Sequence, residues 1–343
     1  IPGYPVTVID PTGAGESFCG ATLANILLGV HPVISGMRGG RLAAEKVADW
    51  GARALFQKLP QPDLQLDPRV RINLELVASV SAVVQELPAA GPFNFVGEYL
   101  PPEGHACTLD YFFAVTLQQF GFWETEEGCY QKPLVAAIGG EMRKGSRYLY
   151  FAFTRLLDRD PGFFSPGRQG SATLDELADV FRADDGSVPM PALALHLAKT
   201  NQYGRDMLAL DLTPNKIMAR VNDSTKPLLS LLKTLDHISG YKEDPIRKKS
   251  NLLALTLSQR PEGFLTFGEN ETVAPVVDYH VMRSVLRIGL VEIQDSELRQ
   301  KLAGRQVITP AEEWAVRYAA YQVQEQVEKI SGKPIGAVDW FFF

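Results

Sequence analysis

The chain has 343 residues, of which 45% are hydrophobic and 22% are charged. This composition is typical of a soluble globular protein and excludes a disordered or fibrous one. The formal net charge of -6 argues against direct binding to tRNA or DNA, because proteins that bind duplexes carry a basic face. An acidic chain can still hold a small anionic ligand in a local basic pocket.

The composition also bounds the compartment and the chemistry. No apolar run reaches the roughly 18 residues that a membrane helix needs, and the first residues show no signal peptide. The three cysteines, Cys19, Cys107 and Cys129, are widely spaced and odd in number, which argues against disulfides and against a cysteine zinc site. The histidines show no ligand spacing. We expect a cytoplasmic protein with no metal and no cofactor.

The first predicted unit covers residues 4–60. A short β-type run at residues 5–9 leads into a glycine loop, residues 10–17, and a helix of small residues begins near Ser17. A second helical stretch covers about residues 40–59, and a proline-rich linker at 60–63 ends the unit.

The strand, loop and helix of residues 8–21 resemble the second signature of ribokinase-type sugar kinases, in which glycine amides at a helix N-terminus form an anion hole. The resemblance puts Glu16 in the position of the family's catalytic Asp and covers residues up to about 55. The sugar-binding elements that precede this motif in such kinases are missing. We interpret residues 1–62 as a structural ribokinase-like C-terminal fragment, with a carbohydrate kinase that uses this loop as the alternative.

From about Asp67 the segments have helical period, so the predicted fold is mainly α, with residues 68–343 as one helical domain. Thr173 is a predicted N-cap followed by acids. Thr309, Pro310 and Glu312 form a predicted capping box. The helix that it opens has an apolar stripe of Val316, Ala320, Val323, Val327 and Ile330. We expect a further helix over about 279–290 and a short hairpin near 122–132.

Four features of this domain are candidates for a site. They are the aromatic cluster Phe120, Phe122 and Trp123; Asp278 before Tyr279 at a helix start; the basic run Arg247, Lys248 and Lys249; and Asp339 within the apolar end Val338–Phe343. Each has an ordinary alternative, since aromatic residues pack in cores, Asp caps helices and charges solvate helix ends. Three cations at a helix N-terminus oppose the helix dipole, however, and an anion nearby would relieve them.

Taken in this order, these features resemble the queuosine salvage proteins, from about residue 70 to the end of the chain. The longest matching stretch is residues 173–185, continuing to 189–191. The further matches are Phe120–Trp123, Asn201 with Gly204, Lys248–Leu253, Val277–Tyr279 and Val338–Trp340. The resemblance implies a helical fold related to helix-hairpin-helix DNA glycosylases, with a small N-terminal strand-loop-helix remnant of a kinase. It also implies hydrolysis of the N-glycosidic bond of queuosine 5′-phosphate, with release of queuine for salvage into tRNA.

The resemblance also implies roles for single residues. Asp339 is the predicted catalytic carboxylate, which stabilises an oxocarbenium-like sugar and orients or deprotonates water. Asp278 is predicted to grip the guanine-like edge of the base. Phe120, Phe122, Trp123 and Tyr279 are predicted to stack on the base or shape its pocket. Lys199 and Lys248 are predicted to hold the 5′-phosphate, ahead of Arg247 and Lys249. A non-catalytic helical module that binds nucleic acid stays as a second alternative.

Overall fold

The computed structural model describes residues 66–88 and 93–342. The chain divides into two compact units, residues 1–65 with 233–237 and residues 66–232 with 238–343. The predicted kinase-like fragment, including Glu16, lies outside the described residues. The second unit contains every described residue except 233–237.

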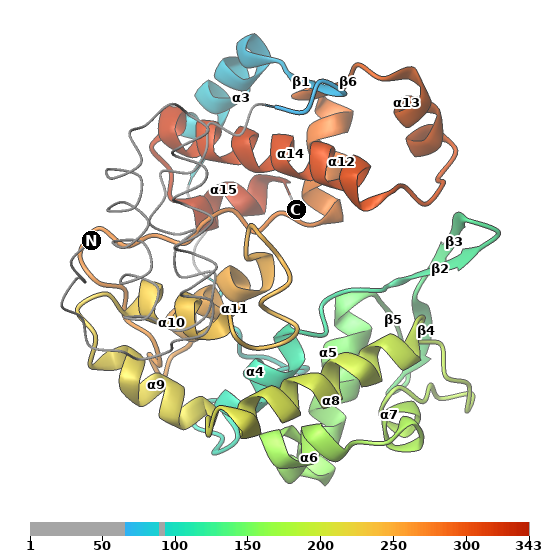
Figure 1. The fold of residues 1–343 in the computed structure, drawn as a ribbon, viewed down its shortest axis with the longest axis vertical. Helices are drawn as coiled ribbons and strands as arrows, with labels where there is room; N and C mark the ends of the chain where they lie inside the picture. Colours follow the sequence, from blue (N-terminus) through green and yellow to red (C-terminus); the bar gives the residue numbers. More distant parts are fainter. Residues whose placement is uncertain (1–65, 89–92, 343) are drawn as a thin grey trace, which may run out of the picture. The chain divides into compact units, whose positions relative to one another are not determined.

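The second unit is mainly helical, as predicted, and Figure 1 shows its small strands at the margins of the helices. The helices of the described residues are α3 (Leu74–Glu86), α4 (Thr108–Thr116), α5 (Ser146–Arg159), α6 (Pro166–Ser171), α7 (Leu174–Val180), α8 (Leu193–Ala209), α9 (Pro214–Asn222), α10 (Pro227–Leu235), α11 (Lys248–Gln259), α12 (Tyr279–Ile288), α13 (Ser296–Ala303), α14 (Pro310–Ser331) and α15 (Ile335–Phe342), with a 3-10 turn η2 (Pro161–Phe164). Their strands are β1 (Val70–Ile72), β2 (Trp123–Glu126), β3 (Cys129–Pro133), β4 (Val135–Ile138), β5 (Glu141–Lys144) and β6 (Val291–Ile293).

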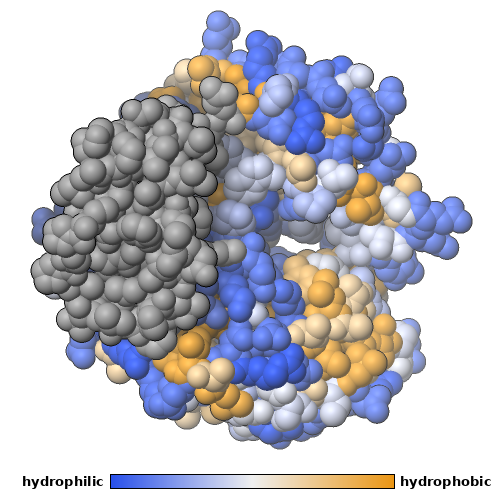
Figure 2. Space-filling view, viewed as in Figure 1, coloured by the Kyte–Doolittle hydropathy of each residue, from blue (hydrophilic) through white to orange (hydrophobic). Residues whose placement is uncertain are grey.

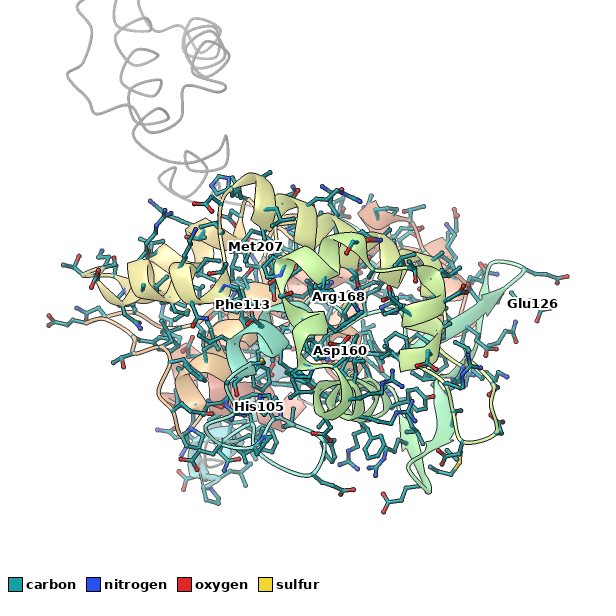
Figure 3. The ribbon with its side chains drawn as sticks, turned by 90° about the horizontal axis from the view of Figure 1, so that it is seen from below. His105, Phe113, Glu126, Asp160, Arg168 and Met207 are labelled. Atoms are coloured by element: carbon teal, nitrogen blue, oxygen red, sulfur yellow. The ribbon has the colours of Figure 1, made fainter. Side chains whose placement is uncertain are left out.

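The strands form three antiparallel pairs. β1 pairs with β6, with Val70 opposite Ile293, and so joins the first described residues to the C-terminal helices. β2 with β3 and β4 with β5 are local hairpins. The first hairpin confirms the one predicted near 122–132, and its tip residue Glu126 extends away from the helices (Figure 3).

The predicted helix starts are confirmed. The hydroxyls of Thr173 and Thr309 accept hydrogen bonds from the backbone N–H groups of Glu176 and Glu312. The carboxylates of these two glutamates in turn accept from the backbone N–H groups of the two threonines. These reciprocal bonds satisfy amides that a helix start leaves without partners. The helix expected over 279–290 ends earlier, at Ile288, because Gly289 adopts φ 89 and terminates it.

The apolar stripe of α14 is buried from Val316 to Val327, as predicted, but Ile330 in the last turn is 45% exposed. Periodicity gives the direction of a side chain, whereas burial also needs a packing partner opposite that turn. The core itself is rich in aromatic residues, and α4 is buried along almost its whole length. The largest fully buried side chains include Tyr111, Phe112, Phe113, Tyr148, Tyr203 and Tyr241.

Helices α6 and α8 cross at very short range. A Cβ on Gly204 would lie 2.1 Å from the backbone nitrogen of Gly170, so only glycine fits there. Next to this crossing, Asn201 donates to the carbonyl of Ala172 (3.1 Å). Arg168, labelled with Asp160 in Figure 3, donates to Asp160 after α5 and to Glu176 of α7. These contacts fix α5, α6, α7 and α8 as one packed group.

Among the described residues, no helix is both long and apolar enough to cross a membrane.

In the space-filling view a hollow separates the part of the second unit that holds α12, α13 and α14 from the part that holds α5 and α8, with the β2–β3 hairpin at its outer side (Figure 2).

Candidate active site

Asp278 occupies the N-cap of α12. Its Oδ1 accepts from the backbone N–H groups of His280 (2.8 Å) and Val281 (3.3 Å). The ordinary interpretation as a helix cap is therefore correct for this oxygen. No hydrogen bond joins Oδ2 to the described part of the chain. Since an ionised carboxylate has about four acceptor positions, Asp278 can cap the helix and still bind a ligand.

Asp339 lies on α15, a short helix held at both ends. The backbone N–H of Ile335 donates to Glu328 of α14 (3.1 Å), and Ser284 of α12 donates to the carbonyl of Phe342 (2.7 Å). Gln324 of α14 donates to Asp339 Oδ1 (3.1 Å). Burial raises the pKa of Asp339 to about 6, and the charge of Asp278 adds to the rise. The two predicted carboxylates are therefore neighbours in the electrostatic sense.

Lys248 begins α11 and is only 9% exposed. Burial lowers the pKa of its ammonium, while Asp278 and Asp339 oppose the shift. Its backbone N–H donates to Asp244 (2.8 Å), but its Nζ makes no hydrogen bond or ion pair within the described ranges. A buried ammonium without an acceptor is costly, so this group is ready for a ligand oxygen.

Arg317 and Asp244, neither of which was predicted from the sequence, connect these groups. Arg317 of α14 donates through its guanidinium to Asp244 Oδ2 (2.6 Å) and through Nε to the carbonyl of Val277 (3.2 Å). Asp244 in turn accepts the backbone N–H of Lys248. Arg317 thus fixes the start of α11 against the residue before Asp278. The available signal was a cation and an amide, Arg317 and Gln324, seven residues apart beside the apolar stripe of α14.

Asn251, within the matching stretch 248–253, has a structural role. Its amide donates to the carbonyl of Arg247 (2.9 Å), and its oxygen accepts from the backbone of Ala274 (3.1 Å). It therefore holds the segment that leads to Asp278 against the start of α11, where Lys248 lies. We define the carboxylate cluster as Asp244, Lys248, Asp278, Arg317 and Asp339.

Phe120 is half-buried, and its ring is stacked against other side chains of the protein. His196 stacks on its ring, with centroids 4.2 Å apart, and the Lys249 ammonium lies over the ring at 4.5 Å. Lys249 also donates to the carbonyl of Leu117 (2.5 Å). Burial lowers the pKa of Lys249 to about 7 and that of His196 to about 4. Because these neighbours already cover the ring, Phe120 suits a pocket wall better than a stacking platform.

Trp123 and Tyr279 meet across the chain. The Trp123 side chain lies near Tyr279, the residue after Asp278, and opposes the rise that burial causes in the pKa of the Tyr279 phenol. Both side chains are half-buried, whereas Phe122 is buried at 8% exposure. The structure thus brings the start of the β2–β3 hairpin to the start of α12, and two partly accessible aromatic rings lie next to a carboxylate.

The remaining cations are placed differently from one another. Lys199 of α8 forms an ion pair with Glu243 (2.7 Å). The charge of Lys199 lowers the pKa of Lys249, and the charge of Glu243 raises it. Arg247 is the N-cap of α11 and adopts a left-handed conformation with φ 54. The charges of Asp278 and Asp339 act on Lys248, whereas the Lys249 ammonium lies over the Phe120 ring. The side chains of the neighbouring residues Lys248 and Lys249 therefore lie in different environments.

Two surface hollows lie elsewhere, one of about 410 Å³ beside β6 and α13 and one of about 400 Å³ beside β1 and α14. Neither is lined by a member of the carboxylate cluster. Within residues 66–88 and 93–342, no three His, Cys, Asp or Glu side chains are grouped so that they could hold a metal ion. The carboxylate cluster is the candidate site because acids, a buried ammonium and aromatic rings converge there.

A family model described as queuosine salvage protein matches residues 100–334. The range includes Lys248, Asp278 and Arg317, while Asp339 follows just after it. A mouse protein named queuosine 5′-phosphate N-glycosylase/hydrolase is 21% identical over 274 residues, which cover 73% of this chain and 79% of the mouse protein. Since the family model spans well over half of the chain, the protein belongs to the queuosine salvage protein family.

Proposed function

We propose that this protein is an N-glycosidase that hydrolyses queuosine 5′-phosphate and releases queuine for salvage into tRNA. The observation that carries the proposal is that Asp339, held by Gln324, and Asp278, at the start of α12, both act electrostatically on the buried Lys248. Family membership and the name of the mouse relative support the choice of substrate.

Asp339 is the proposed catalytic carboxylate. Cleavage of the N-glycosidic bond develops positive charge on the sugar, which a carboxylate near C1′ stabilises. A general base works best when its pKa lies near the working pH, and burial brings the pKa of Asp339 to about 6. Asp339 is therefore ionised at neutral pH and remains basic enough to take a proton from the attacking water.

The leaving base sets a second requirement. Queuine is a 7-deazapurine, so protonation at N7, the usual aid to purine departure, is closed. The enzyme must instead stabilise charge spread over the pyrimidine ring. We assign Asp278 to the guanine-like N1–H and 2-amino group, because a carboxylate accepts two parallel hydrogen bonds. Trp123 and Tyr279 are the proposed stacking residues, with Phe122 and Phe120 as the wall behind them.

The phosphate requires cations. We assign Lys199 to the 5′-phosphate, and we place Lys248 between the phosphate and the carboxylates, where its ammonium can meet a phosphate or sugar oxygen. The proposed partners are the small-molecule substrate and its product queuine, in the cytoplasm, without direct binding of tRNA or DNA. The proposed reaction requires no cofactor.

The test is a direct assay. The purified protein is incubated with queuosine 5′-phosphate, and free queuine is measured by mass spectrometry, with queuosine as a parallel substrate. We expect release of queuine from the 5′-phosphate and loss of that release in Asp339→Asn. A folded sample that leaves queuosine 5′-phosphate intact over many hours contradicts the proposal.

A further inference from the structure

Gln324 is the one side chain that hydrogen-bonds Asp339 within the described part of the chain. It is fully buried on α14. It follows Arg317 by seven residues, so both side chains leave the helix in nearly the same direction. Arg317 holds Asp244 and the residue before Asp278, whereas Gln324 holds Asp339. One face of α14 therefore supports both predicted carboxylates.

The Gln324 amide is engaged on one side only. Its Nε2 donates to Asp339 Oδ1 (3.1 Å), but its Oε1 is buried and accepts no hydrogen bond from the described residues. Amide N and O have nearly the same size. A half-turn of the amide would place the oxygen against Asp339 without breaking another hydrogen bond to the protein, because Oε1 makes none.

We infer that Gln324 is a positioning residue for Asp339 that serves both of its protonation states, donating to the carboxylate and, after the amide turns, accepting from the carboxylic acid. This inference rests on the proposed function, in which Asp339 takes a proton from water. A fixed cation in place of Gln324 would stabilise the ionised form of Asp339 alone. An amide can instead donate to the carboxylate or accept from the carboxylic acid, and so hold the Asp339 side chain in one orientation in both forms.

The other charged groups around Asp339 act in opposite directions. Asp278 of α12 raises its pKa, and Lys248 of α11 lowers it. Glu328 of α14 is bound to the first residue of α15, Ile335. The hydrogen bond from Gln324 lowers the pKa of Asp339 against the effect of burial. Removing that bond should therefore raise the pH at which Asp339 takes up its proton.

The experiment is the pH dependence of turnover in Gln324→Met, which keeps the length of the side chain and removes both polar groups. In the unmodified protein we expect kcat to fall as the pH drops through about 6. In Gln324→Met this limb should move upward by roughly one pH unit, with KM changed less than about twofold. Gln326→Met, on the exposed side of the same helix, is the matched control and should keep the limb in place.

A second measurement does not depend on activity. Infrared difference spectra of the ligand-free protein report the carboxylic acid band of Asp339, assigned by its loss in Asp339→Asn. The midpoint of this band should rise in Gln324→Met. It should rise further in Gln324→Glu, where a second carboxylate faces Asp339. Gln324→Glu also serves if the methionine variant does not fold.

The two ideas can fail separately. If the unmodified protein releases no queuine, the proposed function is wrong, and the infrared midpoints still test Gln324. If turnover occurs and Gln324→Met lowers kcat equally at every pH with an unchanged midpoint, Gln324 has only a packing role and the inference is overturned.

Discussion

Two regions of the second unit contain the matching runs of the family resemblance, and they differ in whether the polar side chains of these runs are bonded to the protein. The first is the group of α6, α7 and α8 with the β4–β5 hairpin, which holds the longest matching stretch, residues 173–185. The second is the carboxylate cluster, which matches only at short runs. In the first region several of the motif's polar side chains, among them Thr173, Glu176 and Asp184, are bound by the protein itself. In the second, Lys248 Nζ and Asp278 Oδ2 make no hydrogen bond to any described residue.

The first region shows what its long motif is for. Asp184 accepts from the backbone N–H groups of Gly139 (3.0 Å) and Gly140 (2.8 Å) and so holds the β4–β5 turn. Thr173 and Glu176 close the capping box of α7. These bonds need neighbouring residues in a fixed order, whereas a site needs only that single side chains converge in space. The longest motif of a chain can therefore mark its scaffold while short ones mark its chemistry.

The contrast between the two regions is tested first by Asp339→Asn. We expect kcat to fall by roughly 10³-fold, since the variant loses the base and the charge that faces the sugar cation. Substrate binding, measured by calorimetry, should persist because Asp278 and the lysines are intact. Asp184→Asn is the matched control, an acid-to-amide change in the first region. Turnover that survives in Asp339→Asn would remove Asp339 from the mechanism.

The second change is Lys248→Met. We expect kcat/KM to fall by about 10²-fold, because a buried ammonium that bonds a ligand oxygen makes a strong charge-assisted contact. The charge of Lys248 also lowers the pKa of Asp339, so the acid limb of activity should move to higher pH. The control is Lys242→Met, whose ammonium already pairs with Asp206 (2.9 Å). Equal losses in the two variants would contradict a special role for Lys248.

The third change, Asp184→Ala, addresses the scaffold. It should lower stability by about 1 kcal/mol, because two backbone amides lose a charged acceptor that lies at the surface. Thermal melting followed by circular dichroism measures this effect. The kcat/KM value should stay within about twofold. If activity fell much further than stability, the division between scaffold and site would not hold.

The smallest expected effect concerns the start of α14, the helix that carries Arg317 and Gln324. Hydrogen bonds from Lys301 and Thr309 lower the pKa of Glu312 from 4.5 to about 2. A carboxylate with a lowered folded-state pKa stabilises the fold above its unfolded value and loses this effect as the pH falls through the folded value. The stabilisation should therefore disappear between about pH 4.5 and 2.

Melting curves of Glu312→Gln and of the unmodified protein measure this effect. The two should differ at pH 7 and converge towards pH 2. Glu313→Gln, at the exposed neighbouring position, should follow the unmodified protein throughout. A constant difference across this range would show that Glu312 acts through packing instead of charge.

Local patterns in the sequence were enough to predict the mainly helical fold and several of its boundaries. The N-cap at Thr173, the capping box at Thr309, the start of α12 at Tyr279 and the β2–β3 hairpin depend on contacts between residues close in the chain. The resemblance supplied Asp278 and Asp339 as candidates, and the roles of both stay predictions. Arg317 and Gln324 were missed because polar residues beside an apolar stripe usually face solvent.

Periodicity, turn chemistry and motif order act over short distances, so the residues alone were enough to predict the mainly helical fold, several helix caps and the family. Helix packing, in contrast, sets which of two neighbouring residues faces the carboxylate cluster. Lys248 lies near the carboxylates, the Lys249 ammonium lies over the Phe120 ring, and His196 stacks on Phe120. Helix packing also places Gln324 of α14 against Asp339 of α15. Such choices depend on how helices pack, since adjacent residues on a helix point about 100° apart and meet different partners.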